Sequence, residues 1–221
     1  MKVLITSGAT RARIDGVRFI TNFSSGKTGA AIADYFSDNG EKVFFLHGIN
    51  SQKPEKHEQC KSYDSFSDLN EKIKHILTEN HIDIIIQLAA VGDFHVDKVV
   101  IDKKEYSPDM LSKIDSNSEI SINLKKNFKI ISRLRNYSKN KDVKIIGFKL
   151  TNTTNDIERK NAIKKVFDCN ADYVVHNDMH DINNLKNRQF FIFKNNEIIH
   201  KCSSRSDLSQ KLFETIKGNM Q

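Results

Sequence analysis

The stretch Ile82-Asp83-Ile84-Ile85-Ile86-Gln87-Leu88-Ala89-Ala90-Val91 is the most apolar segment of the chain. A nearly continuous apolar run of this length is typical of a strand that is buried on both faces of a parallel sheet. We therefore expect residues 82–91 to form a central strand. Such strands occur where helices cover both faces of the sheet, so this one segment already predicts an α/β fold.

Strand and helix patterns alternate on both sides of that central segment. Strands are expected over residues 3–5, 43–46, 59–63, 119–124, 143–150 and 173–175, with a hairpin over 190–193 and 197–200. Helices are expected over residues 28–39, 66–77, 128–137, 155–167 and 204–217. Strands separated by helices of this length imply right-handed crossovers, which predict a doubly wound, mostly parallel sheet.

One segment departs from this alternation. Between Gly92 and Ser118 the pattern is lost, and Lys, Asp, Ser and Pro108 dominate. We interpret this part as an excursion or mobile loop rather than a packed layer. With no internal repeat and no linker in evidence, residues 1–221 are expected to form a single domain with an inserted flap at about 93–118.

The composition narrows the function classes. The 221 residues carry 35 Lys and Arg against 28 Asp and Glu, a net charge of +7. The bases are interleaved with acids, so an anionic small substrate explains the charge as well as nucleic acid does. Cys60, Cys169 and Cys202 have neither disulfide-scaffold nor zinc-ligand spacing, which predicts reduced thiols and no metal site. No segment approaches the ~20 apolar residues of a membrane span. We expect a cytoplasmic protein without nucleic-acid or membrane partners.

Ligands of doubly wound sheets bind beyond the carboxyl ends of the strands, where loops and helix N-termini gather. Four predicted strand ends carry unusual residues. They are Thr6-Ser7-Gly8-Ala9-Thr10, Ala89-Ala90-Val91-Gly92-Asp93, Gly147-Phe148-Lys149 and His176-Asn177-Asp178. These segments are therefore the places where binding and catalytic residues are expected.

The segment Asn22-Phe23-Ser24-Ser25-Gly26-Lys27-Thr28-Gly29 leads directly into the first predicted helix. Small residues there let backbone N–H groups approach an anion, and the helix dipole favours a phosphate. The segment differs from a P-loop because Thr21 stands where glycine or alanine is expected, and because a long loop, not a strand, is expected before it. A plain helix start capped by Ser24 or Ser25 explains the same residues.

Other motifs have structural explanations as good as their functional ones. The first strand is followed by Gly8 but by no G-x-G-x-x-G, so an NAD(P)-dependent reductase is only the second hypothesis. Tyr137 and Lys141 have the Tyr-x-x-x-Lys spacing of some reductases, yet an exposed turn explains them better. His176 and His180 resemble metal ligands, but we expect solvent-exposed histidines in a loop.

Lysines of the flap and of the fourth predicted helix are ambiguous in the same way. Lys113 is one of several flap lysines, and its spacing alone indicates a solvent-exposed charge. Lys160 and Lys164 are four residues apart and therefore share a helix face, where an anion between them would relieve their repulsion. A lysine-rich exposed face is the simpler interpretation of that pair.

Taken in order, these segments resemble the phosphopantothenate–cysteine ligases of coenzyme A biosynthesis. The resemblance begins at Ile5-Thr6-Ser7-Gly8-Ala9-Thr10-Arg11 and continues through the signature Ile14-Asp15-Gly16-Val17-Arg18-Phe19-Ile20-Thr21-Asn22-Phe23-Ser24-Ser25-Gly26-Lys27-Thr28-Gly29. Later matches are Ala89-Ala90-Val91-Gly92-Asp93-Phe94, Lys113-Ile114, Lys126-Asn127, Gly147-Phe148 and Asn177-Asp178. The matches span nearly the whole chain, and the long signature is the most specific of them.

The resemblance implies a Rossmann-like homodimer that joins 4′-phosphopantothenate to L-cysteine. It implies CTP as co-substrate, an acyl-cytidylate intermediate, release of CMP and pyrophosphate, and Mg²⁺ on the triphosphate. Relatives from higher organisms use ATP, so the choice of nucleotide stays open. Many bacterial relatives are fused behind a flavin-dependent decarboxylase. Because the first strand begins at residue 2, we expect a stand-alone ligase with a separate phosphopantothenoylcysteine decarboxylase as its pathway partner.

The resemblance also assigns roles to residues of this chain. It implies catalytic roles for Asn22, at the activated acyl phosphate, and for Lys113, on a lid over the triphosphate. The nucleotide-binding residues that it implies are Gly8, Ala89, Ala90, Val91, Asp93, Phe128, Lys129, Ile130, Ile131, Phe148, Lys160 and Lys164. The substrate-binding residues that it implies are Arg18, Ser24, Ser25, Gly26 and Asn177.

The sequence departs from the family pattern at several of these places. Lys149-Leu150-Thr151 replaces the usual acid-rich segment, and Phe128 stands where many relatives have proline. The flap aligns poorly, so Lys103 and Lys104 are rivals of Lys113. Lys165 is likewise a rival of Lys164.

Overall fold

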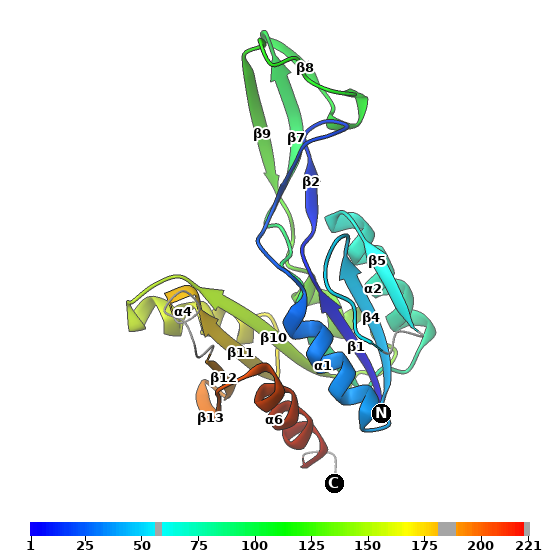
Figure 1. Ribbon diagram of the computed structural model, residues 1–221, viewed down its shortest axis with the longest axis vertical. Coiled ribbons are helices and arrows are strands. Elements are labelled where there is room, and N and C mark those ends of the chain that lie inside the picture. The colour runs from blue at the N-terminus through cyan, green and yellow to red at the C-terminus, as the bar shows by residue number, and fades with distance from the viewer. Residues whose placement is uncertain (56–58, 181–188, 219–221) are drawn as a thin grey trace.

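A computed structural model describes residues 1–55, 59–180 and 189–218. Within them lies an eight-stranded sheet (Figure 1). Its strands, in order across the sheet, are β13 (Glu197–Cys202), β12 (Phe190–Lys194), β11 (Tyr173–Asp178), β10 (Lys144–Thr151), β6 (Ile84–Gln87), β1 (Lys2–Ser7), β4 (Lys42–Gly48) and β5 (Cys60–Tyr63). Strands β11 to β5 are mutually parallel, and β12 and β13 complete the sheet as an antiparallel hairpin. The predicted Rossmann-like, doubly wound α/β fold is confirmed.

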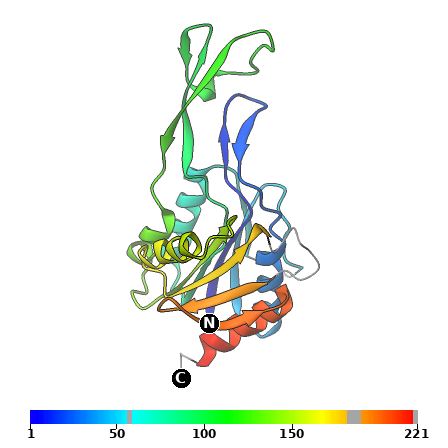
Figure 2. The same cartoon turned by 90° about the vertical axis from the view of Figure 1, so that its left-hand side faces the viewer.

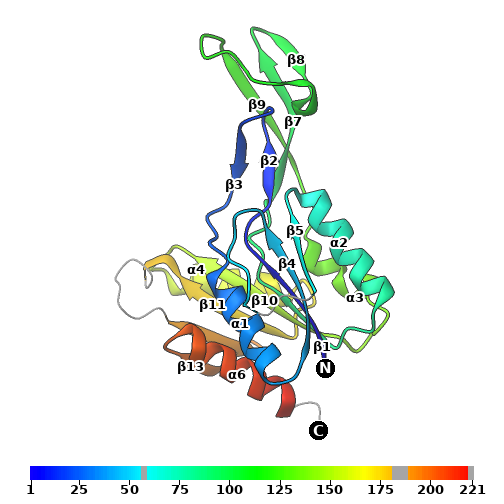
Figure 3. The same ribbon diagram turned by 45° about the vertical axis from the view of Figure 1, so that its right-hand side comes forward.

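Helices cover both faces of this sheet. Helices α1 (Lys27–Asp38) and α6 (Arg205–Gly218) pack on one face around a core that includes Phe36 and Leu212. The opposite face carries α2 (Phe66–Glu79), α3 (Leu134–Tyr137) and α4 (Asp156–Phe167). Figure 3 shows α2 and α3 on the side of the sheet away from α1 and α6. No helix in the described part of the chain is both long and apolar enough to cross a bilayer.

Strand β6 is the centre of the core, because Ile84, Ile85 and Ile86 have no exposed surface at all. The strand is shorter than the predicted 82–91, since it ends at Gln87. Beyond it the chain leaves the sheet but stays attached to the end of β1, where Ala90 N–H donates to the Gly8 carbonyl at 2.7 Å. Ala89 and Ala90, which were predicted to be part of the strand, therefore lie beyond it at the carboxyl edge of the sheet.

An arm projects from this carboxyl edge, away from both termini (Figures 1 and 2). It is a three-stranded antiparallel sheet in the order β8 (Lys104–Tyr106), β7 (Phe94–Ile101), β9 (Ile120–Lys126), with a 3₁₀ turn η1 (Pro108–Met110). The hairpin of β2 (Arg11–Arg13) and β3 (Phe19–Thr21) stands beside it.

The arm corrects two predictions. The segment does leave the main sheet, as predicted, but 94–101, 104–106 and 120–126 are strands of an ordered arm and 107–119 lacks strands, so the inserted part runs further than 93–118. The predicted strand 119–124 belongs to this arm and not to the main sheet. Val96 and Val99 both face the arm's interior although they are three residues apart, because the register of β7 shifts between Val96 and Lys98, and this shift breaks the two-residue period of a strand. Whether residues 1–221 behave as a single domain stays a prediction.

The predicted helix over 128–137 is also wrong, because this segment is a 3₁₀ turn, η2 (Ile130–Arg133), followed by one turn of α3. Lys141 explains why the helix stops there: its Nζ donates to the carbonyl of Ser138 at 2.7 Å and so satisfies the end of α3. The Tyr137 hydroxyl donates to Asn70 Oδ1 at 3.1 Å. Lys141 is exposed, as the turn interpretation predicted, but Tyr137 is half-buried at the end of α3 and bonds to a distant helix.

Candidate functional site

The carboxyl ends of β1 and β6 meet in a turn that only glycine permits. Gly8 has φ +84°, and a Cβ added there would lie 2.8 Å from Gly48 N. The chain beyond β6 is bonded to this turn, because Thr10 N–H donates to the Ala90 carbonyl at 3.3 Å and Gly92 N–H donates to Thr10 Oγ1 at 2.8 Å. Four predicted nucleotide-binding residues therefore lie on two backbone segments that are hydrogen-bonded to each other: Gly8 on one, and Ala89, Ala90 and Val91 on the other.

A groove of about 1050 Å³ opens next to this edge, between the arm, the β2–β3 hairpin and the start of α2. Asn22, Asp93 and Phe128 line it, which joins three predicted site residues from distant parts of the sequence. Its charged lining consists of Arg11, Arg13 and Lys126 with Asp64, Glu71, Asp93, Asp97 and Asp109. The acids outnumber the bases, so the groove as a whole does not attract a polyanion.

Asn22 and Asp93 are held in this groove by different contacts. Asn22 follows β3 directly, is exposed, and donates from Nδ2 to the Val91 carbonyl at 3.4 Å. Asp93 is exposed and forms an ion pair with Lys129 Nζ at 2.5 Å. Lys129 therefore neutralises the Asp93 carboxylate, rather than offering a free cation to a phosphate.

Phe128 gives the groove an aromatic wall. The Arg133 guanidinium lies 3.3 Å from the centre of its ring, and the Phe66 ring meets it edge-on at 4.9 Å between centroids. These contacts fix the ring's orientation. The two residues that follow Lys129 are not surface groups: Ile130 is 2 % exposed and Ile131 packs over Gly147. Their side chains belong to the core, so only their backbone could contact a ligand.

His95 and Asn127 form a polar pair in the groove that the sequence analysis did not select. Asn127 is 7 % exposed, and its Nδ2 donates to the Gly92 carbonyl at 2.9 Å. Its Oδ1 must then accept the 2.8 Å bond from His95 Nδ1, which places the proton of the neutral ring on Nδ1. The ring consequently presents Nε2 as an acceptor. In the sequence, only the Lys126-Asn127 dipeptide of the family resemblance pointed to this pair.

The start of α1 lies below this turn. Gly26, with φ +78°, is the N-cap of the helix and makes no side-chain bond, so neither Ser24 nor Ser25 caps it and that interpretation is wrong. The loop is held by its backbone instead: Gln52 N–H donates to the Ser25 carbonyl at 3.0 Å, and Ser7 Oγ donates to the Gly26 carbonyl at 3.2 Å. The helix begins with N–H groups that no side chain satisfies.

Phe148 lies at the same edge but on the α1 side of the sheet. Its neighbour Gly147 pairs with Gln87, the last residue of β6, so Phe148 stands one residue beyond the end of that strand. Its side chain packs against the core on the α1 face. Asn177, on β11, is 5 % exposed, and its Nδ2 has no hydrogen-bond partner among the residues that the structure describes. Neither residue lines the groove.

The remaining predicted residues also lie outside the groove. Lys160 is exposed on α4, and Lys164 on the same helix forms an ion pair with Asp168 at 2.9 Å. Lys113 is exposed on the arm. Arg18, at the tip of the hairpin, donates to Asp15 Oδ2 at 2.6 Å and to the Ile114 carbonyl at 3.1 Å. Only part of the predicted site is therefore brought together within one chain.

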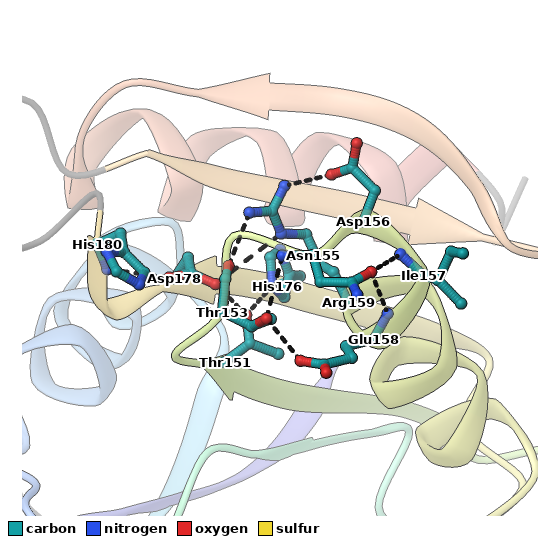
Figure 4. Close-up of polar contacts among 10 residues, drawn as sticks. All are labelled: Thr151, Thr153, Asn155, Asp156, Ile157, Glu158, Arg159, His176, Asp178 and His180. Atoms are coloured by element: carbon teal, nitrogen blue, oxygen red, sulfur yellow. Dashed lines mark hydrogen bonds and ion pairs between the residues drawn. The ribbon is translucent and has the colours of Figure 1, made fainter.

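A buried polar cluster occupies the ends of β10 and β11 (Figure 4). His176 is 2 % exposed in β11, and its Nε2 shares a hydrogen bond of 2.7 Å with Thr151 Oγ1. The expectation of an exposed loop is therefore wrong for His176, although His180 is exposed. Thr151 also donates to Asp178 Oδ2. Because β11 continues to Asp178, polar residues that looked like a loop are strand.

Arg159 links this cluster to α4. Its Nη2 donates to the Thr153 carbonyl at 3.1 Å, and its Nε lies 3.9 Å from Asp178 Oδ2 (Figure 4). Burial by itself would raise the pKa of Asp178, but the hydroxyl of Thr151, the N–H groups of His180 and Thr153, and the charge of Arg159 lower it. The cluster thus joins the N-terminal half of α4 to the strand ends.

The fold and the groove together define a Rossmann-like α/β protein with a ligand-sized groove at the carboxyl edge of its sheet. The family model of the DNA/pantothenate metabolism flavoprotein C-terminal domain matches residues 1–220. The chain belongs to this family.

Two curated relatives are both named coenzyme A biosynthesis bifunctional protein CoaBC. The one from Methanocaldococcus jannaschii is 29% identical over 219 residues, which cover 98% of this chain and 50% of the relative. The one from Bacillus subtilis is 34% identical over 178 residues, which cover 80% of this chain and 40% of the relative. The chain therefore spans about half the length of the curated relatives that it matches.

Solved structures share the fold along the whole chain. The DNA/pantothenate metabolism flavoprotein from Streptococcus pneumoniae has a TM-score of 0.85 at 26% identity, covering 99% of both chains. The C-terminal domain of a CoaBC protein has a TM-score of 0.74 at 26% identity, covering 99% of this chain and 95% of its own. A Cab2 mutant in complex with phosphopantothenate-cysteine has a TM-score of 0.77 at 21% identity, which shows a common fold.

The bonds around Asn127 predict the tautomer of His95. Long-range ¹H–¹⁵N spectra at a pH where the ring is neutral should show the proton on Nδ1, because Nδ1 must donate to Asn127 Oδ1. The Asn127→Ala variant should lose this preference. A ring that carries its proton on Nε2 in the unsubstituted protein would contradict the geometry.

Proposed function

We propose that the chain is a phosphopantothenate–cysteine ligase, which makes 4′-phosphopantothenoyl-L-cysteine with CTP as the driving co-substrate. The observation that carries the proposal is the groove that joins Asn22, Asp93 and Phe128 beside the Gly8 turn. Family membership and the names of the CoaBC relatives support coenzyme A biosynthesis as its context.

The proposed reaction has two chemical steps. A carboxylate oxygen of phosphopantothenate attacks the α-phosphorus of CTP, and the bond to pyrophosphate breaks. The cysteine amine then attacks the acyl carbon, loses a proton, and CMP leaves. Negative charge gathers on phosphoryl and carbonyl oxygens in both steps, so preorganised donors at those oxygens lower the barriers.

The acid-rich lining of the groove suggests how a nucleotide would be oriented. Asp93 and the ring of Phe128 offer polar and apolar contacts to a base, whereas the neighbouring carboxylates repel phosphates. The triphosphate is better placed at the adjoining edge, where the Gly8 turn and the uncapped start of α1 supply N–H groups. In this arrangement Asn22, between the two regions, contributes an uncharged donor at the reacting acyl phosphate.

The other assignments are proposals of the same kind. Lys113 would act on the triphosphate from the arm, with Lys160 and Lys164 on α4 near the phosphates. Arg18, Asn177 and the loop 24–26 would contact phosphopantothenate. The role of Asn177 is supported by its buried Nδ2, which has no hydrogen-bond partner among the described residues and could donate to a ligand oxygen.

Mg²⁺ is proposed to arrive with the nucleotide. Hard divalent cations that serve triphosphates keep mostly phosphate and water oxygens as ligands. Among the residues that the structure describes, no group of three or more His, Cys, Asp or Glu side chains converges as a cation cage. Asp93 follows the chain segment that is bonded to the turn, and its pairing with Lys129 makes it a weak ligand.

A homodimer is also proposed, on the strength of apolar side chains left uncovered around the arm. They include Phe23, which is fully exposed, and Val17, Met110 and Ile120, which are 60%, 80% and 44% exposed and do not line the groove. Single chains rarely expose neighbouring large apolar groups. Sedimentation velocity should give twice the chain mass, and a monomer at assay concentrations would count against the assembly. A separate decarboxylase that consumes the product would be the pathway partner.

The direct test of the proposed activity is pyrophosphate release by the purified protein. Release should require a nucleotide and phosphopantothenate together, because the carboxylate is the attacking group, and it should be faster with CTP than with ATP. Product formation should additionally require L-cysteine. Release that is indifferent to phosphopantothenate would defeat the proposal, whereas NAD(P)H binding would favour a reductase.

The Asn22→Ala variant tests the site within the same assay. Product formation should fall by roughly 100- to 1000-fold, the usual effect of removing one donor from a developing oxyanion. Binding of CTP, followed by calorimetry, should be preserved because Asn22 is exposed and its side chain bonds only weakly, at 3.4 Å, to the Val91 carbonyl. The matched control is Asn136→Ala, an exposed amide on α3 outside the groove. Unaltered turnover in Asn22→Ala would remove the residue from the mechanism.

A further inference from the structure

The tip of the β2–β3 hairpin is hydrogen-bonded to the arm next to Lys113. Ile114, the residue after Lys113, donates its N–H to Asp15 Oδ2 at 3.1 Å. Its carbonyl accepts from Arg18 Nη1 at 3.1 Å. Both backbone polar groups of Ile114 are thus taken by hairpin side chains almost a hundred residues away in the sequence. We call this set of contacts, made by Asp15, Arg18 and Ile114, the clamp.

The backbone on both sides of the clamp fits closely as well. Gly16 N–H donates to the Leu111 carbonyl at 2.8 Å. A Cβ added to Gly16 would lie 2.3 Å from the Ser112 carbonyl oxygen, so no side chain fits there without moving the arm. The segment 111–114, which carries Lys113, therefore lies directly against the hairpin tip.

The two carboxylate oxygens of Asp15 have separate tasks. Oδ1 accepts from the N–H groups of Val17 and Arg18 at 2.8 and 2.7 Å, which shapes the hairpin turn itself. Oδ2 accepts from Ile114 N–H and from the Arg18 guanidinium, which joins the hairpin to the arm. One side chain, 2 % exposed, thus couples the two structures.

The environment keeps this carboxyl ionised. Burial alone would raise the pKa of Asp15, but the N–H groups of Val17, Ile114 and Arg18 and the Arg18 guanidinium outweigh it and lower the pKa to about 2. Because this pKa lies below the ordinary value, the contacts stabilise the fold above about pH 4 and are lost as the pH falls toward 2. The clamp is consequently charged at any pH suited to an enzyme assay.

The arm has little else to hold this segment. Its own core has only three buried apolar side chains among the described residues, Val96, Val99 and Ile114. The hairpin contributes Ala12 and Ile14 to the same cluster. A core so small stabilises a sheet only weakly, so the arm depends on the hairpin for its position.

We propose that Asp15 and Arg18 are positioning residues that hold Lys113 at a fixed place relative to Asn22. The inference rests on the ligase function proposed above. The paired strands of the hairpin connect the clamp at the tip to Asn22, which follows β3 directly. Lys113 is then not carried on a free lid, because its backbone is bound to the element that positions Asn22.

The first test is a double-mutant cycle. Asp15→Asn keeps an acceptor for the hairpin turn but replaces Oδ2 by an NH₂ that faces two donors, so the clamp opens. Turnover should fall about 10- to 100-fold, the effect of a small displacement of a catalytic group. Asp15→Asn combined with Lys113→Ala should be no slower than Lys113→Ala alone. The inference would be overturned if the fold-losses in turnover of the two single variants multiplied in the double variant, or if either single variant had normal turnover.

The matched control is Asp115→Asn. This substitution removes the same charge two residues from Lys113, but its amide oxygen can still accept the 2.8 Å bond from Asn117 N–H. Its turnover should match the unsubstituted protein. A loss equal to that of Asp15→Asn would assign the effect to local charge instead of the clamp.

Hydrogen exchange provides a readout that does not depend on activity. The Ile114 amide should exchange at least tenfold faster in Asp15→Asn, because its acceptor is gone, and at an unchanged rate in Asp115→Asn. Should Asp15→Asn fail to fold, Gly16→Ala tests the same contact by pushing on Ser112, and should also lower turnover. Failure of the unsubstituted protein to turn over would defeat the proposed function alone, and unchanged Ile114 exchange would then overturn the clamp separately.

Discussion

The whole arrangement depends on the burial of β6. Ile84, Ile85 and Ile86 are shielded on both faces, and β1 and β10 bond to either edge of the strand, so the register of the central sheet is fixed there. A strand with no exposed face cannot slip by one residue without turning its side chains into the wrong layer. The place where β6 stops therefore decides where the edge of the sheet lies, and with it the position of the Gly8 turn and the groove.

A second constraint acts beyond that edge, because the arm is too thin to be stable alone. Its apolar face must be covered, and the β2–β3 hairpin provides that cover together with the clamp. This links Asn22 and Lys113, two residues that are 91 positions apart, through one stretch of paired backbone. The sequence signature around Asp15 and Arg18 then has a structural explanation in addition to any contact with substrate.

The sequence predicted the sheet well because its signals are local. Buried runs such as residues 84–86 and the Asn195-Asn196 turn, whose residues have φ of +51° and +65°, mark their own structure. Strand β7 of the arm was missed because a register shift between Val96 and Lys98 breaks its apolar alternation, and because the arm strands pair with each other instead of with the main sheet. His176 was misjudged because the groups that surround its ring, Thr151 on β10 and Phe191 and Phe193 on β12, come from neighbouring strands, which no local pattern reveals.

The candidate site divides in the same way. Asn22, Asp93 and Phe128 could be assigned to one site from the resemblance to the ligase family. The strand-end rule could find only Asp93, because Asn22 follows β3 of the hairpin and Phe128 lies beyond β9 of the arm. The pair His95 and Asn127 and the clamp on Ile114 depend on contacts between distant segments, so they emerge only from the folded chain. Residues on α4, such as Lys160, lie outside the groove within a single chain. Their proposed role therefore requires the triphosphate to extend beyond the groove.

The central claim is that the groove holds the nucleotide base against Phe128. The chain has no tryptophan, so Phe128→Trp introduces a single fluorescent probe in the groove, and Phe213→Trp on α6 is its matched control. Saturating CTP should change the emission of the first variant with a midpoint equal to that of its activity, and leave the second unchanged. If the Phe128→Trp protein is active but its emission does not change when CTP is added, the base does not bind against residue 128 and the central claim is contradicted.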